Sequence, residues 1–319
     1  ADFAAEELGL DGFGHNLPNW LLRREMAAHL GALPGARLIA PGRVEALTPR
    51  SAEVLVRLSG GRQARVRLVV GADGRDSFVR EAVGIAARRW GYGQKALVFT
   101  VAHELPHRDV SIEIHRSGGP FTLAPLPDRD GLPASAVVWM EEGSRARELF
   151  EMPEAPFEAA LNERAAGALG ALRLTSGRRL WPIVAQAADR LDGPRVALVA
   201  EAAHVVPPIG AQGLNMSLRD IATLLDLAEA ARAGGGDIGA ANVLSAYHRA
   251  RHREILARMA GIDLLNRAAM AGWEPLRDAR RAGLRALHGF GPARRAAMRL
   301  GLGARAEAEA KFRRDRDGP

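Results

Sequence analysis

The sequence contains no cysteine, which excludes a disulfide framework, a thiolate metal site and a cysteine nucleophile. Aromatic residues make up only 5% of the chain, too few for the stacking surfaces of a protein that binds single-stranded nucleic acid. Charges or prolines interrupt every apolar run well before the roughly 18 residues that a membrane-spanning helix needs. The first twenty residues carry Asp2, Glu6 and Glu7 instead of a basic start and an apolar stretch, so we expect no secretory signal. These absences predict a cytoplasmic protein that does not span a bilayer.

The charge is unevenly distributed along the 319 residues. The net charge is +7, yet residues 240–319 carry 17 basic and 8 acidic side chains, whereas residues 1–239 carry 27 and 29. Only Lys95 and Lys311 are lysines among 44 basic residues, a bias that GC-rich coding produces without selection for binding. We therefore expect no nucleic-acid partner. Two interpretations of the basic tail remain open: a surface that meets anionic lipid, or a solvated helix face.

The periodicity of the first 85 residues predicts a mixed α/β protein, in which 47% apolar residues suffice for a sizeable core. Apolar residues at helical spacing predict a helix over residues 17–30. Strands are expected over residues 36–47, 52–58 and 64–70, with a hairpin turn at Ser59-Gly60-Gly61. The last of these strands runs into a tight turn, Gly71-Ala72-Asp73-Gly74, and then into a helix start over residues 76–83.

The middle of the chain is rich in strand patterns, and the end is helical. Glycine and proline turns separate expected strands at residues 96–102, 110–115, 121–125 and 134–140, which predicts an antiparallel sheet. Residues 146–169 are expected to be mainly helical, and residues 195–200 to form a buried strand. A helix over residues 214–233 should stop at Gly234-Gly235-Gly236, and residues 240–314 should be helical with basic faces.

Two familiar motifs lack the structural setting that their chemistry requires. His103-Glu104-Leu105-Pro106-His107 matches the zinc-binding HExxH pattern, but Pro106 opposes the helix that would align both histidines. We expect a strand end and a turn there. Gly91-Tyr92-Gly93-Gln94-Lys95-Ala96 matches GxGxxA, but it does not follow a buried strand and a strand comes after it, so we expect no dinucleotide fingerprint there.

The segment over residues 199–216 joins a buried strand to a helix through a turn rich in proline and glycine. Gly210 and Gly213 remove side chains where a planar ligand could approach, and the first N–H groups of the following helix favour negative charge. Glu201 stands at a strand end, where an acid can accept hydrogen bonds from a ribose hydroxyl. The alternative is a tight connection whose glycines serve packing alone.

Residues 201–220 resemble the second flavin-binding motif of the aromatic-ring hydroxylases, the flavoprotein monooxygenases typified by p-hydroxybenzoate hydroxylase. Residues 71–80 resemble the Asp-Gly motif of the same family, which contacts both the flavin and the nicotinamide cofactor. Shorter matches resemble the branch that hydroxylates ubiquinone precursors: Tyr92-Gly93-Gln94, Glu104-Leu105-Pro106-His107, Gly119-Pro120, Leu126-Pro127, Val138-Trp139 and Trp181-Pro182-Ile183. Together the matches extend from about Gly9 to Gly303.

The sequence departs from the family pattern in two places. The usual Gly-Asp pair is Ala200-Glu201 here, which keeps the carboxylate but moves it by one methylene and places a β-carbon before it. The family also opens with a βαβ unit carrying GxGxxG, a unit of roughly 30 residues that does not fit in the fourteen residues before His15. The resemblance therefore implies a family member truncated at its N-terminus.

The resemblance implies a p-hydroxybenzoate-hydroxylase-like α/β fold that lacks its first βαβ unit and has an antiparallel substrate sheet and a helical C-terminus. Four regions follow from it. Residues 1–85 and 181–236 would form the two parts of the FAD-binding domain, residues 86–180 the β-rich substrate domain, and residues 237–319 a basic helical region.

The implied function is that of an FAD-dependent monooxygenase, which would use NAD(P)H and O₂ to hydroxylate a prenylated phenol in ubiquinone biosynthesis. The implied cofactor-binding residues are Asp73, Gly74, Glu201, Pro208, Gly210, Gly213, Leu214 and Asn215. No catalytic residue and no metal ligand is assigned, and His204 is expected to be a structural hydrogen-bonding group. Peripheral contact with the cytoplasmic membrane face and membership of a hydroxylase complex are further expectations.

Two other hypotheses remain open: a non-catalytic remnant that binds an apolar ligand or a partner complex, and a flavin monooxygenase with another aromatic substrate.

Overall fold

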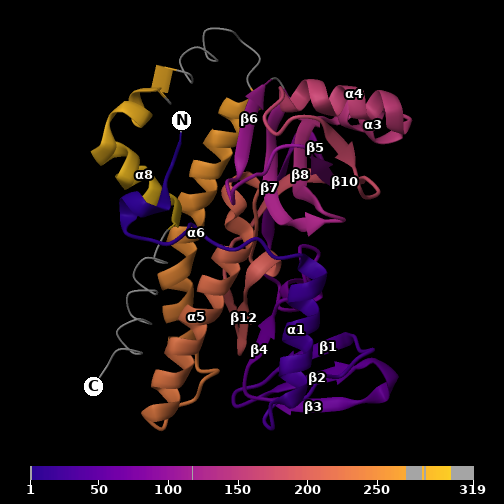
Figure 1. Ribbon diagram of the computed structural model, residues 1–319. Helices are drawn as coiled ribbons and strands as arrows, with labels where there is room; N and C mark the ends of the chain where they lie inside the picture. Colours follow the sequence, from indigo (N-terminus) through magenta and orange to yellow (C-terminus); the bar gives the residue numbers. More distant parts are fainter. Residues whose placement is uncertain (1, 117, 271–281, 284, 303–319) are drawn as a thin grey trace.

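The computed structural model describes residues 2–116, 118–270, 282–283 and 285–302, and its largest element is a seven-stranded sheet (Figure 1). The strand order is β13-β10-β5-β8-β7-β6, with β9 paired to β5, and every pairing is antiparallel. The strands are β5 (Ala87–His103), β6 (Ile112–Arg116), β7 (Gly119–Arg129), β8 (Leu132–Glu142), β9 (Leu172–Leu174), β10 (Arg179–Ala188) and β13 (His204–Val205). The antiparallel sheet predicted over residues 96–140 is confirmed, with longer strands than predicted.

The two faces of this sheet carry different cores, because side chains alternate along each strand. One face buries Leu97, Phe99 and Trp139 under α3 (Gly143–Glu151) and α4 (Glu154–Ala165). Phe99 and Phe157 meet edge to face there, with ring centroids 5.3 Å apart. Ala96 and Met140, which point to the opposite face, join a second core with the helix α6 (Ala241–Met270).

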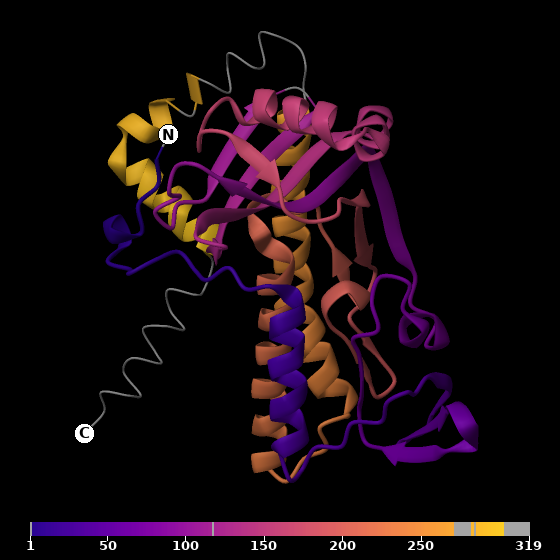
Figure 2. The same cartoon turned by 45° about the vertical axis from the view of Figure 1, so that its right-hand side comes forward.

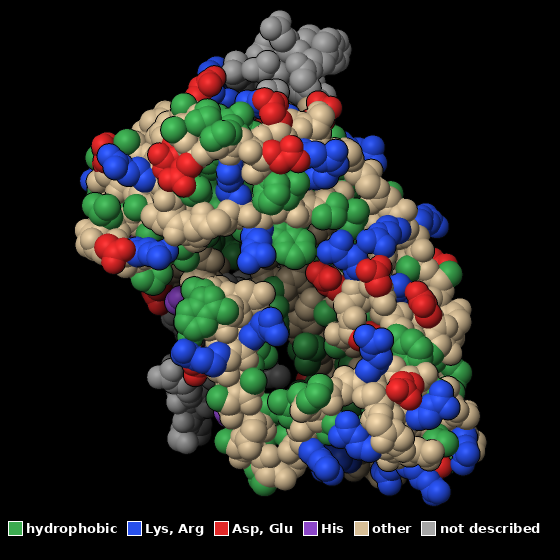
Figure 3. All heavy atoms as spheres, turned by 90° about the vertical axis from the view of Figure 1, so that its right-hand side faces the viewer, with side chains coloured by type: hydrophobic (Ala, Val, Ile, Leu, Met, Phe, Trp, Pro, Cys, Tyr) green, Lys and Arg blue, Asp and Glu red, His purple; other side chains and the backbone are tan. Residues whose placement is uncertain are grey.

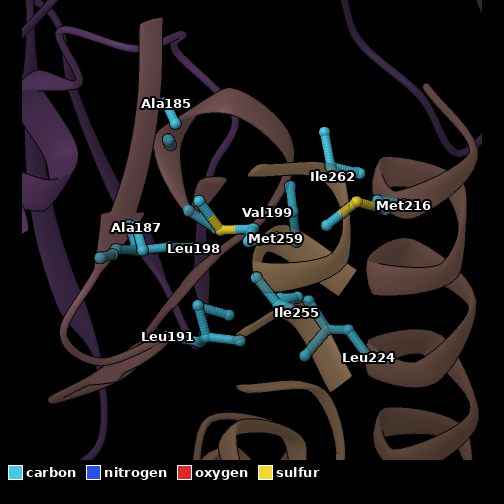
Figure 4. Packing of buried hydrophobic residues seen from close by; sticks show 14 of the residues in the cluster. Ala185, Ala187, Leu191, Leu198, Val199, Met216, Leu224, Ile255, Met259 and Ile262 are labelled. Atoms are coloured by element: carbon cyan, nitrogen blue, oxygen red, sulfur yellow. The ribbon is translucent and has the colours of Figure 1, made fainter. Parts of the chain in front are cut away.

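The second core also holds two short parallel strands and a pair of long helices. Strand β4 (Val69–Gly71) pairs in parallel with β12 (Val196–Leu198), and β11 (Asp192–Gly193) pairs with β12 on the other side. Helix α5 (Gln212–Ala233) packs along α6, and α6 runs on past α5 to contact β6 and β7 of the large sheet (Figure 2). Figure 4 shows Leu198 and Val199 facing Ile255 and Met259 across this core.

Smaller elements surround these layers. A three-stranded meander is formed by β1 (Val44–Pro49), β2 (Val54–Leu58) and β3 (Gln63–Val66), with the predicted turn at η2 (Ser59–Gly61). Helix α2 (Phe78–Ala82) follows β4. The first helical turn, η1 (Ala5–Leu8), contacts α8 (Gly291–Leu302), where Arg294 is paired with Glu7 at 2.8 Å.

Several boundaries differ from the sequence expectations. The predicted first helix is confirmed as α1 (Asn19–Ala32), but none of its residues is buried. Residues 36–43 form no strand, although one was predicted over residues 36–47. The prediction that residues 146–169 are mainly helical is confirmed, with α3 ending at Glu151 and α4 starting after Pro153. Strand β10 was not predicted because it contains Pro182, which the chain accommodates at a bulge where the register with β5 shifts.

Exposed hydrophobic side chains mark the part of the molecule around α1 and α5. Trp20 and Met26 of α1 are 64% and 59% exposed, and Val70 of the edge strand β4 is 45% exposed. Figure 3 shows one face of the molecule hollowed in its lower half, with hydrophobic side chains at the rim and inside the hollow. No helix among the described residues has both the length and the apolar character needed to cross a membrane.

We predict that Leu161→Ala, in the core under α3 and α4, lowers the free energy of unfolding by about 2–5 kcal/mol, because the fully buried side chain leaves a cavity. The control is Leu264→Ala on α6, where the side chain is 69% exposed and the loss should stay within about 0.5 kcal/mol. Urea unfolding measures both. Equal losses in the two variants would contradict the assigned core.

Candidate functional site: two turns at the ends of parallel strands

Two turns far apart in the sequence lie next to each other because β4 and β12 are paired in parallel. Strand β4 ends at Gly71 and β12 ends at Leu198, and the N–H of Val199 donates to the carbonyl of Gly71 at 3.0 Å. Both strands therefore end at the same edge of the sheet. Open parallel sheets bind their ligands at this edge. A Cβ on Gly71 would lie 2.8 Å from Val79 Cγ1, so this glycine is required for the close packing of the turn.

Arg80 holds the first turn, residues 71–80, against the second turn, residues 199–216. Its buried guanidinium donates to the carbonyl of Ala202 and to the carbonyl of Arg75, each at 3.0 Å. The Asp73 carboxylate accepts the hydroxyl of Ser77 and the N–H of Val79, and Ser77 in turn caps α2. The turn over residues 71–80 is thus held by its own polar side chains.

The second turn contains three residues in the left-handed region. Ala200, Gly210 and Ala211 have φ values of 56°, 63° and 51°. Gly210 adopts this conformation without strain, whereas each alanine carries a β-carbon that makes it unfavourable. Ala211 is the N-cap of α5, and no side chain caps the helix there, so its first N–H groups point toward the turn.

Asp220 holds the start of this turn. The carboxylate is fully buried, and one oxygen accepts the N–H of Ala200 at 3.1 Å and Nε2–H of His204 at 2.7 Å. The other oxygen accepts Nε–H of Arg251 from α6 at 2.9 Å. His204 is 2% exposed and has the structural hydrogen-bonding position expected of it.

Helix α6 also contacts the end of β12. The hydroxyl of Tyr247 donates to the carbonyl of Leu198 at 2.8 Å. Burial raises the pKa of this hydroxyl, and the nearby charge of Asp220 raises it further. Tyr247 therefore remains a neutral hydrogen-bond donor at the strand end.

The predicted cofactor-binding residues lie in the segments that follow the two parallel strands. Asp73 and Gly74 follow β4, and the others follow β12: Glu201, Pro208, Gly210, Gly213, Leu214 and Asn215. Glu201, Pro208, Leu214 and Asn215 are exposed. A Cβ on Gly213 would come no closer than 3.9 Å to other atoms, so the chain itself does not require a glycine there.

These features fit a dinucleotide cofactor. The positive end of the 22-residue helix α5 favours a negatively charged group, and the exposed carboxylate of Glu201 is available to a hydroxyl. Nδ1 of His204 is a buried nitrogen without a hydrogen-bond partner among the described residues. Strand β4 forms one edge of the three-stranded sheet beside this site, and Val70 on it is 45% exposed.

The sequence reasoning did not identify Arg80, Asp220 or Arg251. A signal was present, because charged residues stand on stripes that are otherwise apolar. Asp220 lies between Met216 and Leu224 at intervals of four, and Arg251 lies between Tyr247 and Ile255 at the same interval. A charge on a buried stripe requires a partner.

Neither rejected motif lies on a helix, although the strand over residues 87–95 was not expected. His103 ends β5 and a turn follows it, and residues 91–96 lie within β5. Among the described residues, no group of three His, Asp or Glu side chains could hold a metal ion. The Tyr92 hydroxyl donates to Asp263 of α6 at 2.6 Å, and burial, followed by this hydrogen bond, raises its pKa to about 12.

Comparisons with known proteins agree with this geometry. The profile of the FAD binding domain family matches residues 14–259. The chain is 40% identical over 290 residues to the ubiquinone hydroxylase UbiL of Rhodospirillum rubrum, covering 91% of this chain and 67% of that protein. It is 31% identical to the 3-demethoxyubiquinol 3-hydroxylase of Escherichia coli, covering 94% of this chain and 76% of that protein.

Among solved structures, p-nitrophenol 4-monooxygenase PnpA from Pseudomonas putida has the same fold, with a TM-score of 0.73 and 19% identity, covering 91% of this chain and 73% of that one. Across the curated relatives compared, this chain spans from 56% to 76% of their length.

We predict that Asp220→Asn lowers the free energy of unfolding by about 3 kcal/mol, because the buried guanidinium of Arg251 then loses a charged partner. Asp226→Asn is the control, since Asp226 lies exposed on the same helix. Urea unfolding should separate the two variants, and equal stability would rule out Asp220 as the anchor of the turn.

Proposed function

The chain belongs to the FAD binding domain family of flavoprotein monooxygenases, and from this premise we propose that it hydroxylates a prenylated aromatic ring in ubiquinone biosynthesis. The reaction would use NAD(P)H and O₂. One observation carries the proposal: residues 71–80 and 199–215 meet at the carboxyl ends of paired parallel strands. The ubiquinone hydroxylases among the relatives support the choice of substrate class.

In this proposal each part of the edge has a role in binding FAD. Asp73, Gly74 and Glu201 bind the nucleotide portion. The turn from Pro208 through Gly210 and Gly213 to Leu214 and Asn215 lies against the flavin ring, where the N-terminus of α5 stabilises negative charge. When bound, FAD would accept electrons from NAD(P)H and react with O₂. The chain would position the cofactor and exclude water.

The proposed division of the chain follows from these roles. Residues 1–85 and 181–236 build the cofactor-binding part, residues 86–180 form the sheet that faces the substrate, and residues 237–319 form the helical region. The apolar strands of the sheet suit a prenylated ring.

Peripheral contact with anionic lipid belongs to the same proposal, as does a hydroxylase complex. The support for lipid contact is the basic charge of residues 240–319. Of this region α8 contributes Arg294, Arg295 and Arg299, and residues 303–319 lie outside the described part of the chain. The proposed site of action is the cytoplasm, at the membrane face.

We expect the purified chain to take up added FAD and to show the absorbance of a bound oxidised flavin after removal of free cofactor. NAD(P)H should then bleach this absorbance, and a prenylated phenol should accelerate NAD(P)H oxidation. Serum albumin treated in the same way controls for carry-over. A colourless chain that takes up no FAD contradicts the proposal and favours the non-catalytic remnant.

Gly213→Ala tests the approach of the flavin to α5. The chain has room for the added methyl group, so stability should stay equal or rise by up to about 1 kcal/mol, as in other helices. The Kd for FAD should rise about tenfold, since the methyl group enters the space assigned to the ring. Gly261→Ala on α6 is the matched control, an exposed helical glycine with equal room. Equal FAD affinity in both variants would remove Gly213 from the proposed site.

A further inference from the structure

A chain of polar contacts links the two parts of the second turn through α6. It begins at Asp220, which holds Ala200 and His204, and continues to Arg251. Arg251 is 2% exposed, and besides Asp220 it pairs with Glu254 one helical turn further along α6. The start of the turn is therefore tied to a helix that lies outside both flavin motifs.

Glu254 is the centre of this series of polar contacts. Its carboxylate accepts Nη1–H of Arg251 and, at 2.9 Å, Nε–H of Arg258, and it forms an ion pair with Arg219. Arg219 lies on α5, next to Asp220. One carboxylate thus holds three guanidinium groups, from both long helices, at the interface between them.

The series of polar contacts ends at Gly210. Nη1–H of Arg258 donates to Oε1 of Gln212 at 3.5 Å, and Nε2–H of Gln212 donates to the carbonyl of Gly210 at 2.9 Å. Gln212 is the first residue of α5. Contacts therefore run from Ala200 to Gly210 through three residues of α6, although these two positions are ten residues apart along the backbone.

We propose that Arg251, Glu254 and Arg258 are positioning residues, which set the distance between the Ala200 end and the Gly210 end of the turn. This inference rests on the proposed function, since its consequence is flavin affinity. The three residues do not contact the cofactor. They fix α5 and both ends of the turn in one arrangement, so the N-terminus of α5 meets the flavin ring without a cost of reorganisation.

Glu254 and Arg258 hold different parts of the turn, so variants at the two positions should have different effects. Glu254→Gln weakens the link at its centre and should loosen both ends of the turn. Arg258→Gln removes the link to Gln212 together with one donor to Glu254, but Glu254 keeps its contacts with Arg251 and Arg219, so this variant should loosen the Gly210 end alone. Arg253→Gln is the matched control, because Arg253 is an exposed arginine on the same helix.

Amide hydrogen exchange in the chain without FAD tests the coupling separately from function. Two N–H groups report the two ends: Ala200, which donates to Asp220, and Ile209, which donates to Pro207. Glu254→Gln should accelerate exchange about tenfold at both, Arg258→Gln at Ile209 only, and Arg253→Gln at neither. Unchanged exchange in Glu254→Gln and Arg258→Gln would overturn the inference.

FAD titration tests the consequence. We expect the Kd, measured at a temperature at which every variant is folded, to rise about tenfold in Glu254→Gln and Arg258→Gln and to stay constant in Arg253→Gln. In a double-mutant cycle, Gln212→Ala and Arg258→Gln should be non-additive, because they break one link. Additive effects would overturn the role of Arg258.

The failure of this inference differs from the failure of the proposed function. An unmodified chain that binds FAD, with variants that bind it equally well, overturns the positioning role alone. An unmodified chain that binds no FAD overturns the proposed function and the flavin role of these residues together.

Discussion

The carboxylate of Asp220 is the constraint on which the candidate site depends. It is fully buried, and burying a charge costs free energy unless donors surround it. The donors come from three places in the chain: the end of β12, the histidine that follows it, and α6. Satisfying this one group therefore fixes the strand end, the turn and the pair of long helices relative to one another.

This constraint also explains how the turn accommodates two substitutions in the family pattern. Ala200 stands in place of glycine in the left-handed region, which costs about 1–2 kcal/mol for a residue with a β-carbon. Its N–H is bonded to Asp220, and the N–H of Ala203 donates back to the carbonyl of Ala200 at 2.9 Å. These bonds oppose the strain, so the turn keeps its form and the carboxylate of Glu201 remains exposed beside it.

The sequence allowed most of the elements to be predicted, because periodicity and turn residues act locally. The antiparallel sheet, the Gly60 hairpin and the stop of α5 at Gly234 required only local signals. Strand β10 could not be predicted in this way, since Pro182 is compatible with a strand only at a bulge that the partner strand creates. The amphipathic pattern of α1 predicted a helix correctly, but it could not show that this face would remain exposed. Asp220 and Arg251 mark the same limit in the site: their positions on apolar stripes signal that each needs a partner, but only the packing of α5 on α6 shows that they are partners of each other.

The side chains that anchor the site all lie within the described residues. Arg80 joins the two turns, Asp220 holds the second turn, and Arg251 ties it to α6. None of these contacts involves the exposed apolar side chains of α1 or the outer edge of β4. The form of the two turns therefore depends on buried polar contacts and not on the exposed apolar surface of α1 and β4. Because buried groups of the chain itself hold both turns, the turns are preorganised for the proposed cofactor.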